Sequence, residues 1–173
     1  MKNFTNSILL PEELPEIETK TFNPLDKKYL KITLIRMSVF FLLLIGAFIS
    51  FLFLSDENVP KAVITTIFSV LAFFIIYTVV ITIVAFPRKG YLVRENDISF
   101  QRGLVTYKLT TVPFNRIQHV EVNQGVLAKL FMLSSLKLYT AGGTASDLSI
   151  QGLPEDIAKN LKAFLSEKIS EHE

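Results

Sequence analysis

The sequence predicts an α+β protein, in which a two-helix transmembrane hairpin is followed by a small antiparallel β module that ends in one α-helix. Two long apolar runs, at 37–54 and 62–86, contain no charged side chain. From residue 91 onward apolar and polar residues alternate, which is typical of strands with one buried face. Near the C-terminus the apolar residues return at helical spacing. These patterns divide the 173 residues into a polar arm at 1–29, a hairpin at 30–87 and a β module at 88–173.

The arm at 1–29 has neither helical nor strand periodicity. Prolines at 11, 15 and 24 interrupt it, and four glutamates make its first half acidic. We therefore expect an extended segment. The alternative is that the short apolar stretch at 8–10 docks on the β module or on a partner.

The two apolar runs are long enough to cross a bilayer. As helices they reach about 27 Å and about 37 Å, against a hydrocarbon core of about 30 Å. Gly46 with Ser50, and Thr65 with Ser69, could form a close contact between the two helices, because small residues four apart let helix backbones approach. Such spacings are also common in membrane helices that make no contact of this kind.

The basic residues near the runs predict the orientation. The loop at 55–61 offers one lysine against Asp56 and Glu57, whereas both outer flanks of the hairpin are basic. By the positive-inside rule, this places both termini in the cytoplasm and makes the chain a multi-pass membrane protein. The flanking residues are Lys20, Lys27, Lys28, Lys31 and Arg36 before the first run, and Arg88 and Lys89 after the second.

The β module begins almost directly after the second run. Residues 91–95 and 98–103, around Asn96 and Asp97, predict a β-hairpin. The next strand is expected from Val105 to Pro113, and further strands at 117–122, 136–140 and 148–151, with a helical turn at 124–131. A C-terminal helix is expected from Pro154, with its apolar stripe packed on the sheet. The alternative is that this stripe lies on the membrane, but its polar face is not purely basic.

Together, these residues resemble the bacterial pleckstrin-homology-like membrane proteins of the YdbS type. The resemblance rests on the two spans and on the stretches Ile98–Gly103, Val112–Val120, Gln124–Leu127, Leu136–Gly143 and Ile150–Leu153. It implies a curved antiparallel sheet or barrel of about seven strands capped by the C-terminal helix, in the bacterial cytoplasmic (inner) membrane. It also implies no catalysis and no cofactor, and a membrane-protein partner that could be a longer relative carrying several such domains. Self-association into a homo-oligomer stays open.

Two groups of residues are candidates for binding. Arg116 and Gln118 alternate on a predicted strand, where the guanidinium could take a phosphate or carboxylate and the amide could orient it. The structural alternative is that the arginine satisfies loop carbonyls. Gln124 begins the predicted Gln-Gly turn. Lipid headgroups could be bound by basic residues near the membrane junction, namely Arg88, Lys89, Arg94, Arg102 and Lys108.

Composition excludes several function classes. Cysteine is absent, which excludes disulfides and thiolate sites, and two histidines do not suffice for a histidine metal cluster. The net charge of +2 and the scattered lysines give no nucleic-acid footprint. The apolar runs lack the ionisable groups of a transporter. We therefore expect a non-enzymatic platform in the lipid bilayer for another membrane protein, with an anionic headgroup sensor as the alternative.

Overall fold

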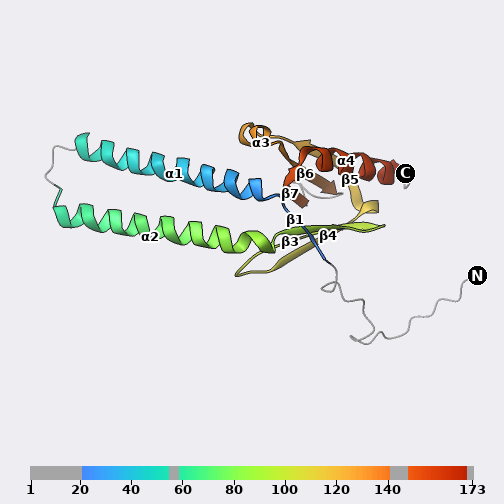
Figure 1. Cartoon of the computed structure of the whole chain (residues 1–173), viewed down its shortest axis with the longest axis horizontal. Helices are drawn as coiled ribbons and strands as arrows, with labels where there is room; N and C mark the ends of the chain where they lie inside the picture. The colour runs from blue at the N-terminus through green and yellow to red at the C-terminus, as the bar shows by residue number, and fades with distance from the viewer. Residues whose placement is uncertain (1–20, 55–58, 141–147, 171–173) are drawn as a thin grey trace, which may run out of the picture.

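The structure, a computed structural model, describes residues 21–54, 59–140 and 148–170 and confirms the α+β class (Figure 1). Two long helices, α1 (Lys27–Leu54) and α2 (Lys61–Ala85), lie side by side, and the β module lies at one end of the pair. α1 therefore begins ten residues before the apolar run and takes in the end of the predicted arm. Residues 1–20 of that arm, including the apolar stretch at 8–10, lie outside the described residues.

Bulky side chains fill the contact between α1 and α2. The rings of Phe48 and Phe68 meet edge to face with centroids 5.6 Å apart, and Thr82 Oγ1 donates to Met37 Sδ at 3.5 Å. The partly buried residues of α1 within the apolar run recur every three or four positions, as in a helix–helix seam. These residues are Met37, Phe41, Ile45, Phe48 and Leu52.

The predicted contact between small residues is wrong. A Cβ added to Gly46 would meet no heavy atom within 4 Å. Ser50, Thr65 and Ser69 are exposed, and the last two donate to carbonyls four residues earlier on their own helix. The described ring contact between the helices is the pair Phe48 and Phe68, and the small residues face outward.

The strands form two antiparallel sheets. The first has the order β1 (Asn23–Pro24), β2 (Gly90–Val93), β3 (Asp97–Arg102) and β4 (Lys108–Pro113). The second consists of β5 (Ile117–Asn123), β6 (Leu133–Thr140) and β7 (Leu148–Pro154). A 3₁₀ turn at Phe114–Arg116, with Phe114 buried, takes the chain from one sheet to the other. The seven described strands therefore do not close into the barrel that the resemblance allowed.

The starts of β4 and β6 each differ from the prediction by three residues. The third strand starts at Lys108 and not at Val105, because a tight loop follows Gly103. Gly103 has φ 120°, and a Cβ there would lie 1.8 Å from the Thr106 carbonyl oxygen, so only glycine fits. β6 starts at Leu133 and not at residue 136, soon after the short helix α3 (Val126–Leu130) ends. The loop expected at 141–147 lies outside the described residues.

The chain before α1 contributes to the module. β1 pairs with β2, Leu25 is buried in the core, and the Asp26 amide donates to the Gly152 carbonyl of β7 at 3.1 Å. This short segment thus contacts both sheets. It was predicted as part of an extended arm, because two residues are too few to show strand periodicity.

The helix α4 (Glu155–Ser170) covers the core, as predicted. Ala158 and Leu165 are buried, and the Phe164 ring meets Phe114 edge to face with centroids 5.8 Å apart. Leu161 and Ile169 pack against the same core. The apolar stripe of α4 is therefore used inside the module.

Candidate binding site

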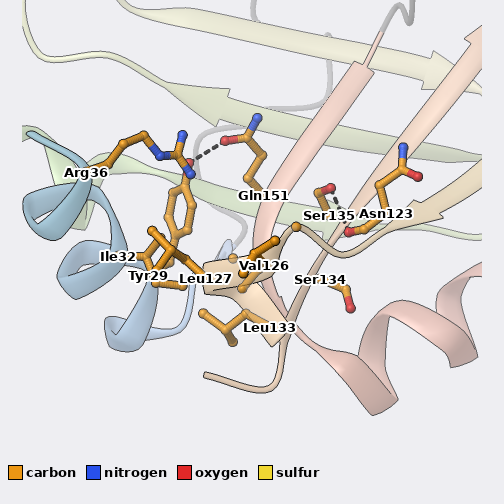
Figure 2. Close-up of a pocket in the computed structure, with 13 residues that line it drawn as sticks. Tyr29, Ile32, Arg36, Asn123, Val126, Leu127, Leu133, Ser134, Ser135 and Gln151 are labelled. Carbon is orange, nitrogen blue, oxygen red and sulfur yellow. Dashed lines mark hydrogen bonds between the residues drawn. The ribbon is translucent and has the colours of Figure 1, made fainter. Parts of the chain in front are cut away.

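A cleft of about 340 Å³ lies where α1 meets the β module (Figure 2). Tyr29, Ile32 and Arg36 of α1 form one wall, and residues of α3 form the other. Asn123, Leu133, Ser135 and Gln151, from the second sheet, complete the lining with neighbouring residues. The cleft thus exists only because the helix is docked on the module.

The α1 wall is held by a contact with β7. Gly152 has φ 79°, and a Cβ there would lie 2.5 Å from Tyr29 Cγ, so the ring sits against bare backbone. The Tyr29 hydroxyl donates to Gln151 Oε1 (Figure 2). Ile32, one turn further on, is 1% exposed. These contacts fix the first turns of α1 relative to the second sheet.

The opposite wall is braced by Gln124. Its Nε2 donates to the Leu133 carbonyl at 3.1 Å and to Glu155 Oε2 at 3.3 Å, which ties the start of α3 to β6 and α4. The pKa of Glu155 is lowered mainly by the hydrogen bond from Lys159, and also by the hydrogen bond from Gln124. Ser135 Oγ donates to the Asn123 carbonyl at 3.0 Å. The Gln124 amide, which was predicted to bind a partner, therefore donates to two acceptors within the chain and braces the site.

The lining favours binding over catalysis. It offers hydroxyl, amide and apolar groups, with Arg36 as the single charged side chain among the thirteen residues. Ser134 is buried and its hydroxyl has no hydrogen-bond partner among the described residues. No carboxylate or imidazole lies in the lining to activate a serine. The cleft can hold a partner group but contains no acid–base pair.

The structure brings four of the five predicted headgroup residues together. Arg102 and Lys108 are directly opposite across β3 and β4, and Arg88 Nη1 donates to the Leu104 carbonyl at 3.3 Å in the loop between them. The pKa of Lys89 is lowered mainly by burial of its ammonium group, and further by the nearby charge of Arg102. None of the four forms an ion pair within the described part of the chain. We call Arg88, Lys89, Arg102 and Lys108 the junction cations.

Arg94 does not belong to this group. Its Nε lies 2.7 Å from Asp97 Oδ1, within the turn between β2 and β3. This turn is at the other end of β2 from Gly90, where the chain leaves α2. The sequence placed Arg94 near the membrane because the residue is close to α2 in number, but a four-residue strand carries it away.

The predicted strand face with Arg116 and Gln118 is not formed. Arg116 is in the 3₁₀ turn, and the register of β5 shifts between Ile117 and His119. As a result Ile117 is buried while His119 is exposed, so the two do not share a face. Arg116 and Gln118 are both exposed, at the end of β5 remote from the cleft.

His119 lies beside a partly buried polar pair. The Tyr139 hydroxyl donates to Glu121 Oε2 at 3.1 Å, and this hydrogen bond is the main cause that lowers the pKa of Glu121. His119 Nε2 is 3.7 Å from Glu121 Oε1. The group sits on the open surface of the second sheet, away from the residues that line the cleft.

Sequence reasoning missed most of the cleft. Tyr29 and Gln151 are separated by 122 residues, and neither shows a motif of its own. Arg36 was identified only as a residue at the inner membrane edge. The one available signal was Gly152, a glycine beside a predicted strand, which often marks a close backbone approach.

Residues 30–169 match the family described as bacterial PH domain, and this range takes in both apolar helices as well as the module. A curated relative, the UPF0699 transmembrane protein YdbS of Bacillus subtilis (strain 168), is 36% identical over 76 residues. That alignment covers 44% of the chain and 46% of the relative, so the chain matches less than half of the relative's length. No solved structure matches the chain.

Proposed function

Since the chain belongs to the bacterial PH domain family, we propose that it is a non-enzymatic, membrane-anchored platform that binds a second membrane protein through the cleft between α1 and the β module. The observation that carries this proposal is the shared lining: a helix that enters the bilayer and a folded module form one cavity. A partner that is itself in the membrane can reach both surfaces at once. The absence of acid–base groups from that lining supports a binding role.

The proposal includes the orientation. Both helices cross the membrane, the module lies on the cytoplasmic side, and Arg36, Arg88 and Lys89 mark the inner boundary. Thr82 contacts Met37. Arg36 directly precedes Met37 and Arg88 follows Thr82 by six residues, so both arginines lie on the module side of this contact, with Arg88 the further from it. The cleft, lined by Arg36, then opens at the level of the headgroups.

Site-specific photo-crosslinking in native membranes tests the platform. A photoreactive residue at Asn123, which is exposed and lines the cleft, is expected to form an adduct with a distinct membrane protein. The matched control is Lys162, exposed on α4 and outside the lining. Adducts that are the same at both positions would contradict the proposal, and an adduct with a second copy of the chain would identify the partner as the protein itself.

A second function, sensing of anionic lipid headgroups, is favoured by the junction cations. Like charges directly opposite on adjacent strands repel one another, and a phosphate between them would relieve this repulsion. Native mass spectrometry of lipids retained by the purified protein tests it. Arg102→Gln with Lys108→Gln is expected to reduce anionic lipid, and Arg94→Gln, at the remote turn, to leave it unchanged. Equal retention by all three proteins would remove the sensor.

A further inference from the structure

The module exposes its large apolar side chains in two places. Among the described residues from 89 onward, five such side chains are more than half exposed. Two belong to the loop between β3 and β4, and three to α3 and the residues after it. They are Val105 at 89%, Tyr107 at 59%, Val126 at 83%, Leu130 at 75% and Met132 at 71%. Exposed apolar side chains that cluster on two short segments mark surfaces that contact a partner or a membrane.

The first segment, the loop at 103–107, lies at the membrane end of the module. β2 leaves α2 at Gly90, and β3 returns antiparallel to it with Gln101 opposite Gly90. The loop that follows therefore lies at or beyond the level where α2 ends. The hydrogen bond from Arg88 to the Leu104 carbonyl fixes it there.

The second segment, α3, lies at the same level beside the other helix. Val126, Leu127 and Ala128 line the cleft together with Ile32 and Arg36, the last residues of α1 before the apolar run. Val126 and Leu130 are four apart and share one face of the short helix. Figure 1 shows α3 next to the base of α1, and the loop between β3 and β4 next to the base of α2.

We propose that these two segments insert into the interfacial layer of the bilayer that holds α1 and α2, so that the module rests on the membrane at two points, one beside each helix. The occupant is lipid, because each segment lies beside the base of a long apolar helix whose hydrophobic window is 0% buried within the protein. Tyr107 places an amphipathic ring at headgroup depth, where tyrosine is favoured. Arg102 and Lys108 stand at the base of the same loop, positioned for phosphate groups.

This inference goes beyond the platform and does not require anionic lipid. Burial of valine, leucine and tyrosine at the interface is driven by the loss of apolar surface from water, which a neutral bilayer also provides. The junction cations add to the contact where phosphates are present. The insertion of the two segments and the sensing of anionic headgroups can therefore fail separately.

The absence of tryptophan from the chain permits a direct test. The variants Val105→Trp and Leu130→Trp each give a single-tryptophan protein, for reconstitution in nanodiscs of neutral phosphatidylcholine without any partner. The matched control is Glu95→Trp, in the exposed turn at the far end of β2. Both test probes are expected to emit at shorter wavelength than the control and to lose intensity when the acyl chains are brominated.

The two-point contact would be overturned if the tryptophan at either test position had the same emission wavelength and the same quenching as the Glu95→Trp control. Far-ultraviolet circular dichroism shows whether each variant is folded. Tyr107→Trp and Val126→Trp serve as second probes of the same segments, with the same expected and contrary outcomes. Because no other protein is present, a negative result here leaves the crosslinking test at Asn123 unaffected.

Discussion

The docking of α1 on β7 depends on a glycine at position 152, where the Tyr29 ring contacts the backbone. Tyr29 lies in the first turn of α1, Gly152 lies in β7, and the ring packs where a side chain would otherwise be. Neither residue belongs to an apolar repeat. Sequence patterns therefore predict the two elements but not the contact that joins them.

Gly152→Ala is expected to lower the free energy of unfolding by about 1–3 kcal/mol, because a non-glycine residue is strained at this φ and its Cβ would overlap the Tyr29 ring. Thermal unfolding of the purified protein in detergent micelles measures the loss. Gly125→Ala is the control, since a Cβ at that position meets nothing within 4 Å. Equal effects of the two substitutions would mean that the Tyr29 contact contributes nothing specific.

Glu155 predicts a pH dependence of stability. Its pKa in the folded protein is lowered by the hydrogen bonds from Lys159 and Gln124, so its stabilising contribution is complete above the unfolded value near 4.5. That contribution is lost as the pH falls through the lowered folded-state pKa. The stability difference between the natural protein and Glu155→Gln is therefore expected to shrink on acidification. A difference that stays constant across this pH range would contradict the role of the Glu155 carboxylate.

At the level of elements, hydrophobic length and period predicted α1, α2 and α4 correctly, and alternation located most strands. The predicted contact between small residues of α1 and α2 was wrong, because spacing alone does not say which face of a membrane helix meets its neighbour. The face that is used carries Phe48 and Met37, and Gly46 lies outside it. Alternation also failed at β5, because Arg116 lies in the 3₁₀ turn before the strand. The bulge between Ile117 and His119 then shifts the register around Gln118.

Phe48→Ala is expected to weaken the association of α1 with α2 by about 0.5–1.5 kcal/mol, the range for an aromatic pair. Thermal stability in nanodiscs, followed by far-ultraviolet circular dichroism, measures the change. Gly46→Ala adds a methyl group where no atom is near and should have no effect. A larger loss for Gly46→Ala than for Phe48→Ala would restore the contact between small residues.

At the level of the whole molecule, the helices and the module form one body, with Leu25 and Phe86 from the two helix bases in the module's core. Composition predicted the order of the parts, and the side of the membrane that charge indicates stays a prediction. They did not predict the cleft, because it is built from α1, α3 and the second sheet, and no local pattern reports contacts between segments so far apart in the chain.

The proposed orientation can be tested in the cysteine-free chain by adding one cysteine at a time. Thr21→Cys and Lys162→Cys are expected to resist a membrane-impermeant maleimide in intact bacterial protoplasts and to react after lysis. Lys61→Cys, at the start of α2, should react in intact protoplasts. Labelling of Lys162→Cys before lysis would place the module outside the cytoplasm.

The position of β1 in the chain has a consequence for biogenesis. The ribosome makes β1 before either apolar helix, whereas its partner β2 follows both. The four-stranded sheet can therefore be completed only after both helices have been synthesised, and only if the two ends of the hairpin emerge on one side of the membrane. A chain that inserted a single helix would leave β2 without its edge partner and Leu25 outside the core. Formation of the β1–β2 pair is thus coupled to the insertion of the complete hairpin.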